Sequence, residues 1–251
     1  MDLVGFVGGA YLLFAESIRQ AMTRPRYPRL IVDQMYYIGV KSLILVFATN
    51  FSTGMVMAIQ FGFGLEQFGG KLYVPKLVSL SIVRELGPVF TSLMLAARVS
   101  AGIASEVGSM AVTQQIDAIR ALGTSPIKKI VIPRIAATFL CLPLLTVMAN
   151  VVGIFGAMLA SASELGISPD FFLQKTADTV TSNDFIVGMV KVPFFALFIS
   201  VPACFYGMTT RDGTQGVGIA TTKAVVVSSI LIVIGDFFLT KMAWMVLKWM
   251  S

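Results

Sequence analysis

The chain has 251 residues, of which 56% are hydrophobic and 13% are charged, and its mean hydropathy is +0.84. An ordinary soluble domain carries about 25% charged residues, so this composition excludes that class and indicates a membrane protein. Lys and Arg total 19 against 13 Asp and Glu. Because the basic residues flank apolar segments, they favour a role in membrane topology over nucleic-acid binding. The sequence has no histidine, which disfavours triad hydrolases and zinc peptidases.

The N-terminal segment is expected to belong to the mature protein and to lie along the membrane interface. Met1 and Asp2 are not followed by a basic n-region, so no cleaved signal peptide is predicted. The apolar run over residues 3–15 is interrupted by Glu16 and Arg19. It is short for a crossing helix, which needs about 20 residues. We interpret it as an interfacial helix, with a sixth, tilted span as the alternative.

About five apolar segments are long enough to cross a bilayer, at residues 36–61, 77–104, 135–160, 185–208 and 224–247. The sequence therefore predicts an all-α membrane protein with about five transmembrane helices. We expect a single domain over residues 1–251, with an N-terminal segment at 1–30 and a transmembrane bundle at 36–247. Cys141 and Cys204 lie in apolar stretches and are expected to be inert packing residues.

Charge in the loops predicts the orientation of the chain. The loops expected in the cytoplasm carry the basic residues Arg19, Arg24, Arg26 and Arg29, then Arg120, Lys128, Lys129 and Arg134, then Arg211 and Lys223. The segment between the third and fourth spans is acidic, with Glu164, Asp170, Asp178 and Asp184 against Lys175. With five spans, this pattern predicts a cytoplasmic N-terminus and a C-terminus on the opposite side.

The second span contains two opposite charges followed by a Gly-Pro pair. Arg84 and Glu85 are costly inside a membrane and must face protein, water or a partner charge. Pro88 has no N–H, so the carbonyl of Arg84 loses its helical partner and the helix can bend. This pattern indicates a polar station on a cavity wall, with a purely structural ion pair as the alternative. Lys191 and Asp236 lie in later apolar spans, and the same two interpretations apply to them.

Small residues recur at every fourth position behind this bend. One row comprises Ser92, Ala96, Ser100, Ala104 and Gly108, and a second row lies alongside it at Ala97, Ala101, Ser105 and Ser109. Such spacing lets two helix backbones approach closely. We expect this face to pack against another helix, either of the same chain or of a second copy.

A short helix is predicted in the loop after the second span. Thr113 can cap it, its apolar face includes Ile116 and Ile119, and Gly123 offers a left-handed stop. About nine residues give a length of roughly 14 Å, too short to span. The helix would present Gln114, Asp117 and Arg120 outward, either to dock a soluble partner or simply to anchor at the interface.

Two long motifs resemble a known family. The stretch RELGPVFTSLMLAARVSAGIASEVGSMAVTQQIDAIRALGTSPIKKIVIPR is similar to the signature region of the MlaE/YrbE permeases, and TTKAVVVSSILIVIGDFFLT is similar to their last span. The resemblance extends from about Arg29 onward. It implies the membrane subunit of an ATP-driven phospholipid transporter of a bacterial inner membrane, which moves lipids between inner and outer membranes and maintains lipid asymmetry.

The resemblance also implies partners. It suggests a homodimer that works with a cytoplasmic ABC ATPase dimer, a periplasmic MCE-domain hexamer and, in some systems, a STAS-domain protein. No cofactor is expected on this chain, and ATP with Mg²⁺ is expected on the ATPase. Consistently, the nearest approach to a P-loop, GLEQFGGKL, lacks the required glycine spacing and a Ser or Thr after Lys71.

By the same resemblance, two sets of residues receive roles. The set expected to bind lipid comprises Arg84, Glu85, Lys191, Phe61, Phe63, Leu65 and Phe68. The set expected to contact the ATPase comprises Glu106, Gln114, Gln115, Asp117 and Arg120. The aromatic residues could instead form a lipid-facing belt.

Three other functions stay open from the residues alone. A secondary transporter could use Arg84, Glu85 and Asp236 for ion coupling, although no two-half symmetry is visible. A membrane-embedded lipid enzyme is disfavoured by the lack of histidine and of any metal-binding cluster. An assembly scaffold that carries no substrate is the third alternative.

Overall fold

The computed structural model describes residues 3–23 and 27–250, and within these ranges the chain is helical without a β-strand. Five helical runs are long and apolar enough to cross a membrane, at Pro28–Glu66, Lys71–Val112, Ile127–Glu164, Ser182–Met208 and Gly213–Met245. The prediction of an all-α membrane protein with five spans is confirmed. Four residues used in the sequence analysis, Met1, Asp2, Arg24 and Arg26, lie outside the described residues.

Contacts group the chain into two compact units. The first contains the described residues of Met1–Ser42 together with Leu95–Cys141 and Phe194–Ile234. The second contains those of Leu43–Met94, Leu142–Pro193 and Gly235–Ser251. Three long helices contribute a part to each unit, namely α8 (Ile132–Glu164), α10 (Ser182–Met208) and α11 (Gly213–Met250). The single domain expected over residues 1–251 stays a prediction.

In the first unit, the N-terminal helix α1 (Leu3–Ala21) is longer than expected and packs on α10 through aromatic rings. The ring of Phe6 stacks on Tyr206 at 5.2 Å between centroids and meets Phe205 edge-on at 5.5 Å. The helix leaves Val7, Tyr11 and Leu12 exposed. It is not one of the five candidate spans. Its location along the membrane interface stays a prediction.

The helix α2 (Pro28–Ile38) begins with a proline and ends at Gly39, where a short 3-10 turn over Val40–Ser42 follows. The first predicted span, residues 36–61, lies within the membrane-length run Pro28–Glu66, and the run changes from α2 to the 3-10 turn at Gly39. Eleven residues at 1.5 Å each give about 16 Å, so α2 is too short to cross a bilayer alone.

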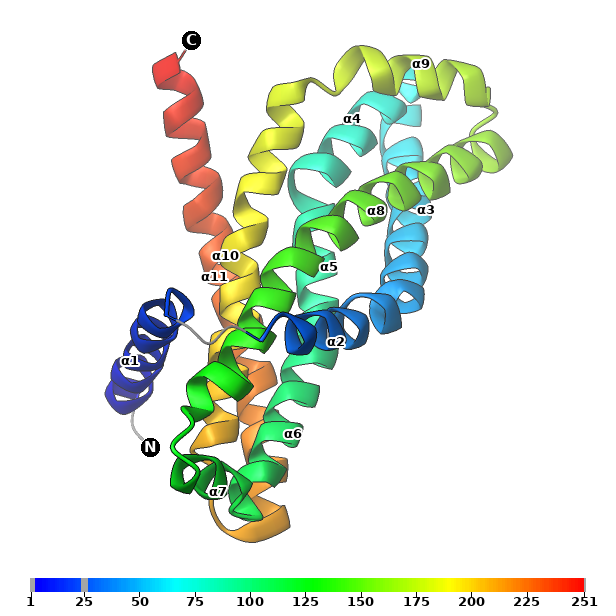
Figure 1. Ribbon diagram of the computed structural model, residues 1–251. Coiled ribbons are helices and arrows are strands. Elements are labelled where there is room, and N and C mark those ends of the chain that lie inside the picture. Colours follow the sequence, from blue (N-terminus) through cyan, green and yellow to red (C-terminus); the bar gives the residue numbers. More distant parts are fainter. Residues whose placement is uncertain (1–2, 24–26, 251) are drawn as a thin grey trace. The chain divides into compact units, whose positions relative to one another are not determined.

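The second unit is built around α3 (Leu43–Glu66), α4 (Val74–Ser81), α5 (Gly87–Leu95) and α9 (Pro169–Thr179). Helix α4 lies beside α3 and α9 (Figure 1). Their apolar faces bury a core that includes Val74, Val78 and Phe172. Helix α9, which sequence analysis did not predict, is capped by Ser168, whose hydroxyl accepts a hydrogen bond from the Phe171 N–H at 3.4 Å.

Helices α3 and α8 approach each other so closely in the second unit that their backbones touch. A Cβ added at Gly54 would collide with the carbonyl group of Gly153, and one added at Gly156 would collide with that of Phe51. Only glycine leaves room for such contacts. These glycines therefore fix the distance between the two helices.

The first row of small residues packs against other helices of the same chain. All five members, Ser92, Ala96, Ser100, Ala104 and Gly108, are buried. Within the first unit, Ser100 donates to the carbonyl of Ile199 at 3.1 Å, and its hydroxyl lies 2.9 Å from that of Ser228. The predicted packing face is confirmed. In the second row, Ala97, Ser105 and Ser109 are exposed.

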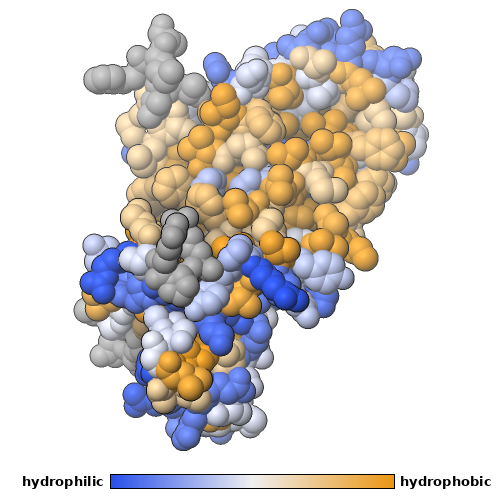
Figure 2. Space-filling view, viewed as in Figure 1, coloured by the Kyte–Doolittle hydropathy of each residue, from blue (hydrophilic) through white to orange (hydrophobic). Residues whose placement is uncertain are grey.

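Apolar side chains also cover the outside of the second unit. Figure 2 shows hydrophobic residues gathered over this part of the surface, with hydrophilic residues at the α9 end. On α8 the exposed members Leu144, Met148, Val151, Phe155 and Leu159 follow helical spacing. A continuous apolar stripe of this kind is typical of a face that contacts lipid.

Candidate functional site

The charged turn of the second span is a π-helical turn, Ile82–Leu86, between α4 and α5. The N–H of Gly87 donates to the carbonyl of Ile82, five residues back. Because Pro88 has no N–H, the Arg84 carbonyl lacks its usual helical donor. The ammonium group of Lys191, on α10, fills this position and donates to the Arg84 carbonyl at 3.4 Å.

Five ionisable residues gather around this turn in the second unit, and we call them the charge cluster: Arg84, Glu85, Asp184, Lys191 and Asp236. The Lys191 ammonium pairs with Glu85 and, at 3.1 Å, with Asp236 on α11. Thr240 donates to the Glu85 carboxylate at 3.3 Å. The Lys191 side chain is only 1% exposed, so its charge is held by these partners rather than by solvent.

Arg84 is paired with an acidic residue that sequence analysis did not assign to the site. Its Nε donates to Asp184 at 2.6 Å, and its guanidinium lies 5.2 Å from the ring centre of Trp244. Asp184 also accepts hydrogen bonds from the backbone N–H of Thr181 at 2.8 Å and from its hydroxyl at 2.7 Å. This reciprocal capping pattern at the start of α10 was the signal in the sequence that could have identified Asp184.

Adjacent charges in the sequence therefore have different partners in the fold. Arg84 pairs with Asp184, whereas Glu85 pairs with Lys191. The Arg84 and Glu85 side chains are 30% and 36% exposed, while Lys191 is buried. The cluster can thus present a guanidinium and a carboxylate to a polar group from outside, with Lys191 as an internal support.

The expected aromatic wall divides into two pairs. Phe61 and Leu65 pack against the core formed by α3, α4 and α9. Phe63 and Phe68 are exposed, at 63% and 78%. The first pair is therefore partly buried against the core of the second unit, whereas the second pair is available to lipid or to a partner.

The predicted loop helix is present in the first unit as α7 (Gln115–Ala121). The expected cap at Thr113 is wrong. Gln114 precedes the helix in the left-handed conformation, at φ 58°, so the chain reverses there and Thr113 ends α6 (Ala101–Val112) instead. The hydroxyl of Thr113 donates to the Ser109 carbonyl at 2.7 Å. The predicted left-handed stop at Gly123 is confirmed by its φ of 71°.

Four of the five residues predicted to contact an ATPase belong to this helix or its first turn. Gln114, Asp117 and Arg120 line a hollow of about 390 Å³, together with Arg211 and Asp212 of the turn between α10 and α11. Asp117 and Arg120 form an exposed pair at 3.1 Å. Gln115 is also exposed.

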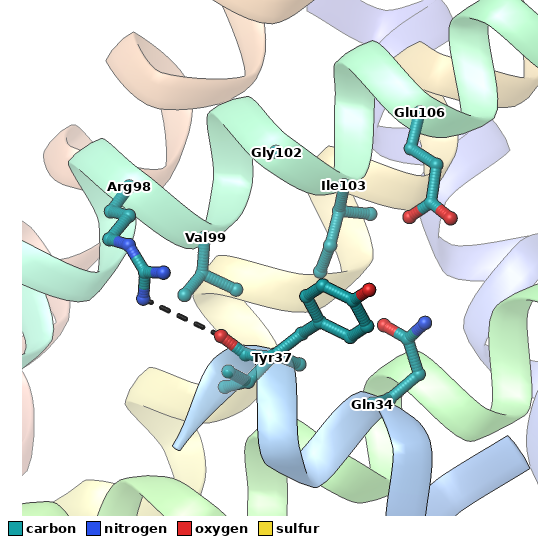
Figure 3. A pocket seen from close by; sticks show the side chains of 8 residues that line it. Gln34, Tyr37, Arg98, Val99, Gly102, Ile103 and Glu106 are labelled. Atoms are coloured by element: carbon teal, nitrogen blue, oxygen red, sulfur yellow. Dashed lines mark hydrogen bonds between the residues drawn. The ribbon is translucent and has the colours of Figure 1, made fainter. Parts of the chain in front are cut away.

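The fifth predicted residue, Glu106, lies apart from α7. It pairs with the buried Arg134 at 2.8 Å. It also lines a separate groove between α2 and α6 (Figure 3).

Five membrane-length helices with an internal charge cluster and a short loop helix define a polytopic membrane protein of the transporter type. The model of the permease MlaE family matches residues 31–242. The chain therefore belongs to the MlaE permease family and is an ABC transporter permease. Together with the five apolar helices, this indicates a multi-pass inner-membrane protein.

Three relatives illustrate the breadth of the similarity. A probable ABC transporter permease protein of Rickettsia felis is 38% identical over 93% of this chain and 91% of its own length. The intermembrane phospholipid transport system permease protein MlaE of Haemophilus influenzae is 31% identical over 92% and 88%. The chloroplastic protein Trigalactosyldiacylglycerol 1 of Arabidopsis thaliana is 36% identical over 83% of this chain and 60% of its own.

Proposed function

We propose that this permease is the membrane subunit of an ATP-driven transporter that moves phospholipid between the inner and outer membranes and so maintains lipid asymmetry. The similarity to an intermembrane phospholipid transport permease over nearly the whole chain carries this proposal. A homodimer would receive energy from a cytoplasmic ABC ATPase, with ATP and Mg²⁺ bound there. A periplasmic MCE-domain hexamer and a STAS-domain protein complete the proposed assembly, with the N-terminus cytoplasmic and the C-terminus periplasmic.

The charge cluster supports a role in lipid handling. An amphiphile needs an apolar wall for its tails and a small polar station for its headgroup. The Arg84 guanidinium can bind a phosphate through two parallel hydrogen bonds, and Glu85 is the partly exposed carboxylate beside it. The exposed Phe63 and Phe68 would contact acyl chains.

The surface of α7 is the proposed contact for the ATPase. Its exposed polar residues are Gln114, Gln115, Asp117 and Arg120. Helix α7 contacts α6 in the first unit, so a force applied to these residues can be transmitted to α6.

A reconstituted transport assay tests the whole proposal. The permease and its ATPase in proteoliposomes should move a fluorescent phospholipid only when ATP and Mg²⁺ are present. Permease alone should hydrolyse no ATP. Movement driven by an ion gradient without the ATPase would favour the second candidate, a secondary transporter. One observation favours that candidate, since Lys191 between two carboxylates resembles a proton-coupling site.

Reversing the charge of Asp117 should uncouple the ATPase. Asp117→Arg places two cations side by side on α7, because Arg120 lies next to it. A misplaced interface charge costs several kcal/mol, so permease-stimulated ATPase activity should fall about tenfold or more. Dimerisation, followed by size-exclusion chromatography with light scattering, should not change.

The control is Asp178→Arg, which reverses an exposed carboxylate on α9. It should leave ATPase stimulation intact. Equal stimulation by the Asp117→Arg variant and the wild type would contradict the role assigned to α7.

A further inference from the structure

We propose that the groove between α2 and α6 binds the headgroup of a phospholipid that carries both a phosphate and a primary ammonium group. In this assignment Arg98 binds the phosphate and Glu106 binds the ammonium. The site lies in the first unit and shares no residue with the charge cluster. This proposal rests on the proposed function in one respect: the lipid bound in the groove would be one that the permease transports.

The groove has a volume of about 430 Å³ and has opposite charges at its two ends. Figure 3 shows Arg98 at one end and Glu106 at the other, with Tyr37 and Gln34 of α2 between them. Gly102 lies in the middle of the α6 wall, and a Cβ built there would meet nothing within 4 Å. The groove therefore has room for a ligand beside Gly102.

The positive end is built to accept a phosphate. Arg98 donates through Nη1 to the hydroxyl of Ser42 and, at 3.5 Å, to the carbonyl of Tyr37. Both bonds use the same nitrogen, and a guanidinium has five N–H groups in all. The ammonium of Lys41 lies 4.0 Å from the Tyr37 ring centre and adds a second positive charge. Arg is the side chain best suited to hold a phosphate through two hydrogen bonds.

The negative end is built to accept an ammonium. Glu106 forms an ion pair with Arg134 through Oε2, and its side chain is more than half exposed. An ammonium has three N–H donors and no acceptor. Glu106 and the Gln34 amide oxygen can together accept two of these donors.

The spacing of the two ends suits a headgroup of this kind. Arg98 and Glu106 are eight residues apart, which is about 12 Å along a helix. Both side chains extend from the same wall on the side that faces α2 (Figure 3). A phosphoethanolamine has two charges a few ångströms apart, and a hydrogen bond at each end adds about 3 Å, so an extended headgroup can bridge a gap of this order. A phosphoglycerol headgroup carries a net negative charge and would place a hydroxyl, instead of an ammonium, beside the Glu106 carboxylate.

The surroundings of the groove match the level of lipid headgroups. Helix α2 is too short to cross and ends with the exposed pair Tyr36 and Tyr37, followed by Lys41. Tyrosine and lysine near the ends of apolar helices mark the membrane–water interface. The buried Ile38, Val99 and Ile103 form the apolar floor beneath the charged ends.

Native mass spectrometry of the purified full-length protein tests this assignment. Phosphatidylethanolamine should bind about tenfold more tightly than phosphatidylglycerol or phosphatidylcholine, the difference expected for one charge-assisted contact. Soluble glycerophosphoethanolamine should compete, whereas inorganic phosphate alone should not. Competition by phosphate alone, or equal affinity for the three lipids, would overturn the assignment.

Substitutions locate the binding in this groove. Gly102→Leu fills the open space and should weaken phosphatidylethanolamine binding about tenfold. Gly218→Leu is the matched control, because Gly218 lies in α11 and also has nothing within 4 Å of an added Cβ. The Gly218→Leu variant should bind phosphatidylethanolamine as tightly as the wild type. If Gly102→Leu changed the oligomeric state but not lipid binding, the groove would be an interface between copies and the proposal would be wrong.

Two polar variants give an independent readout that does not depend on filling the groove. Glu106→Gln keeps an acceptor for Arg134 and should remove the preference for ethanolamine over glycerol headgroups. Arg98→Gln should weaken the binding of both phosphatidylethanolamine and phosphatidylglycerol. An unchanged preference in Glu106→Gln would reject the assignment. Selective binding without any ATP-driven transport would contradict the proposed function and still support this site.

Discussion

Replacing Lys191 with methionine is expected to destabilise the protein by about 3 kcal/mol or more, the range for removing one partner of a buried ion pair. The ammonium is almost fully buried and pairs with both Glu85 and Asp236. Its removal leaves two carboxylates facing each other and also leaves the Arg84 carbonyl without a donor. The thermal unfolding midpoint in detergent should therefore fall clearly below that of the wild type.

A compensated variant separates charge from packing. Adding Glu85→Gln and Asp236→Asn to Lys191→Met removes the unpaired carboxylates and should restore much of the lost stability. Lys223→Met, which removes an exposed lysine on α11, is the matched control and should unfold like the wild type. An unfolding midpoint of Lys191→Met equal to that of this control would show that the cluster does not stabilise the fold.

Gly54→Ala is expected to have a comparably large effect through a different cause. The added methyl group collides with the backbone of Gly153, which cannot rotate away as a side chain could. Helices α3 and α8 must separate, and overpacking of this kind costs typically 1–3 kcal/mol. Less monodisperse protein should be recovered in size-exclusion chromatography, and the unfolding midpoint should fall.

The same helix provides the control for this change. A Cβ added at Gly64, also in α3, meets nothing within 4 Å, and alanine favours a helix over glycine by about 1 kcal/mol. Gly64→Ala should therefore be neutral or slightly stabilising. Similar losses in both variants would mean that the close approach of α3 and α8 does not determine the result.

Features with a local cause could be predicted from the sequence. The five spans follow from runs of apolar residues, and the buried face with Ser100 and Ala104 follows from the spacing of small residues. The stop of α7 at Gly123 follows from the freedom of glycine at positive φ. The loss of the helical donor to the Arg84 carbonyl could be predicted from Pro88, although its replacement by the Lys191 ammonium could not.

Features that depend on distant partners could not be predicted. Glu85 and Lys191 are 106 residues apart, and Arg84 and Asp184 are 100 residues apart. Neighbouring positions suggested that Arg84 and Glu85 belong together, whereas each has its own partner. Sequence analysis places Asp184 in the acidic segment between the third and fourth spans, whereas the structure has it in the first turn of α10, capped with Thr181. The Thr113 cap failed for a similar reason, since nothing in the residue type forces Gln114 into a left-handed conformation.

The π-helical turn at Ile82–Leu86 gives this part of the chain an unusual tolerance to a change in length. It holds one residue more than the α-helical hydrogen-bonding pattern requires. Deleting a single residue here would let the pattern close up as ordinary α-helix, and the buried side of α5 would keep its direction. In a regular α-helix the same deletion turns everything that follows by about 100°, so a relative should tolerate a one-residue gap at this turn more easily than elsewhere in the span.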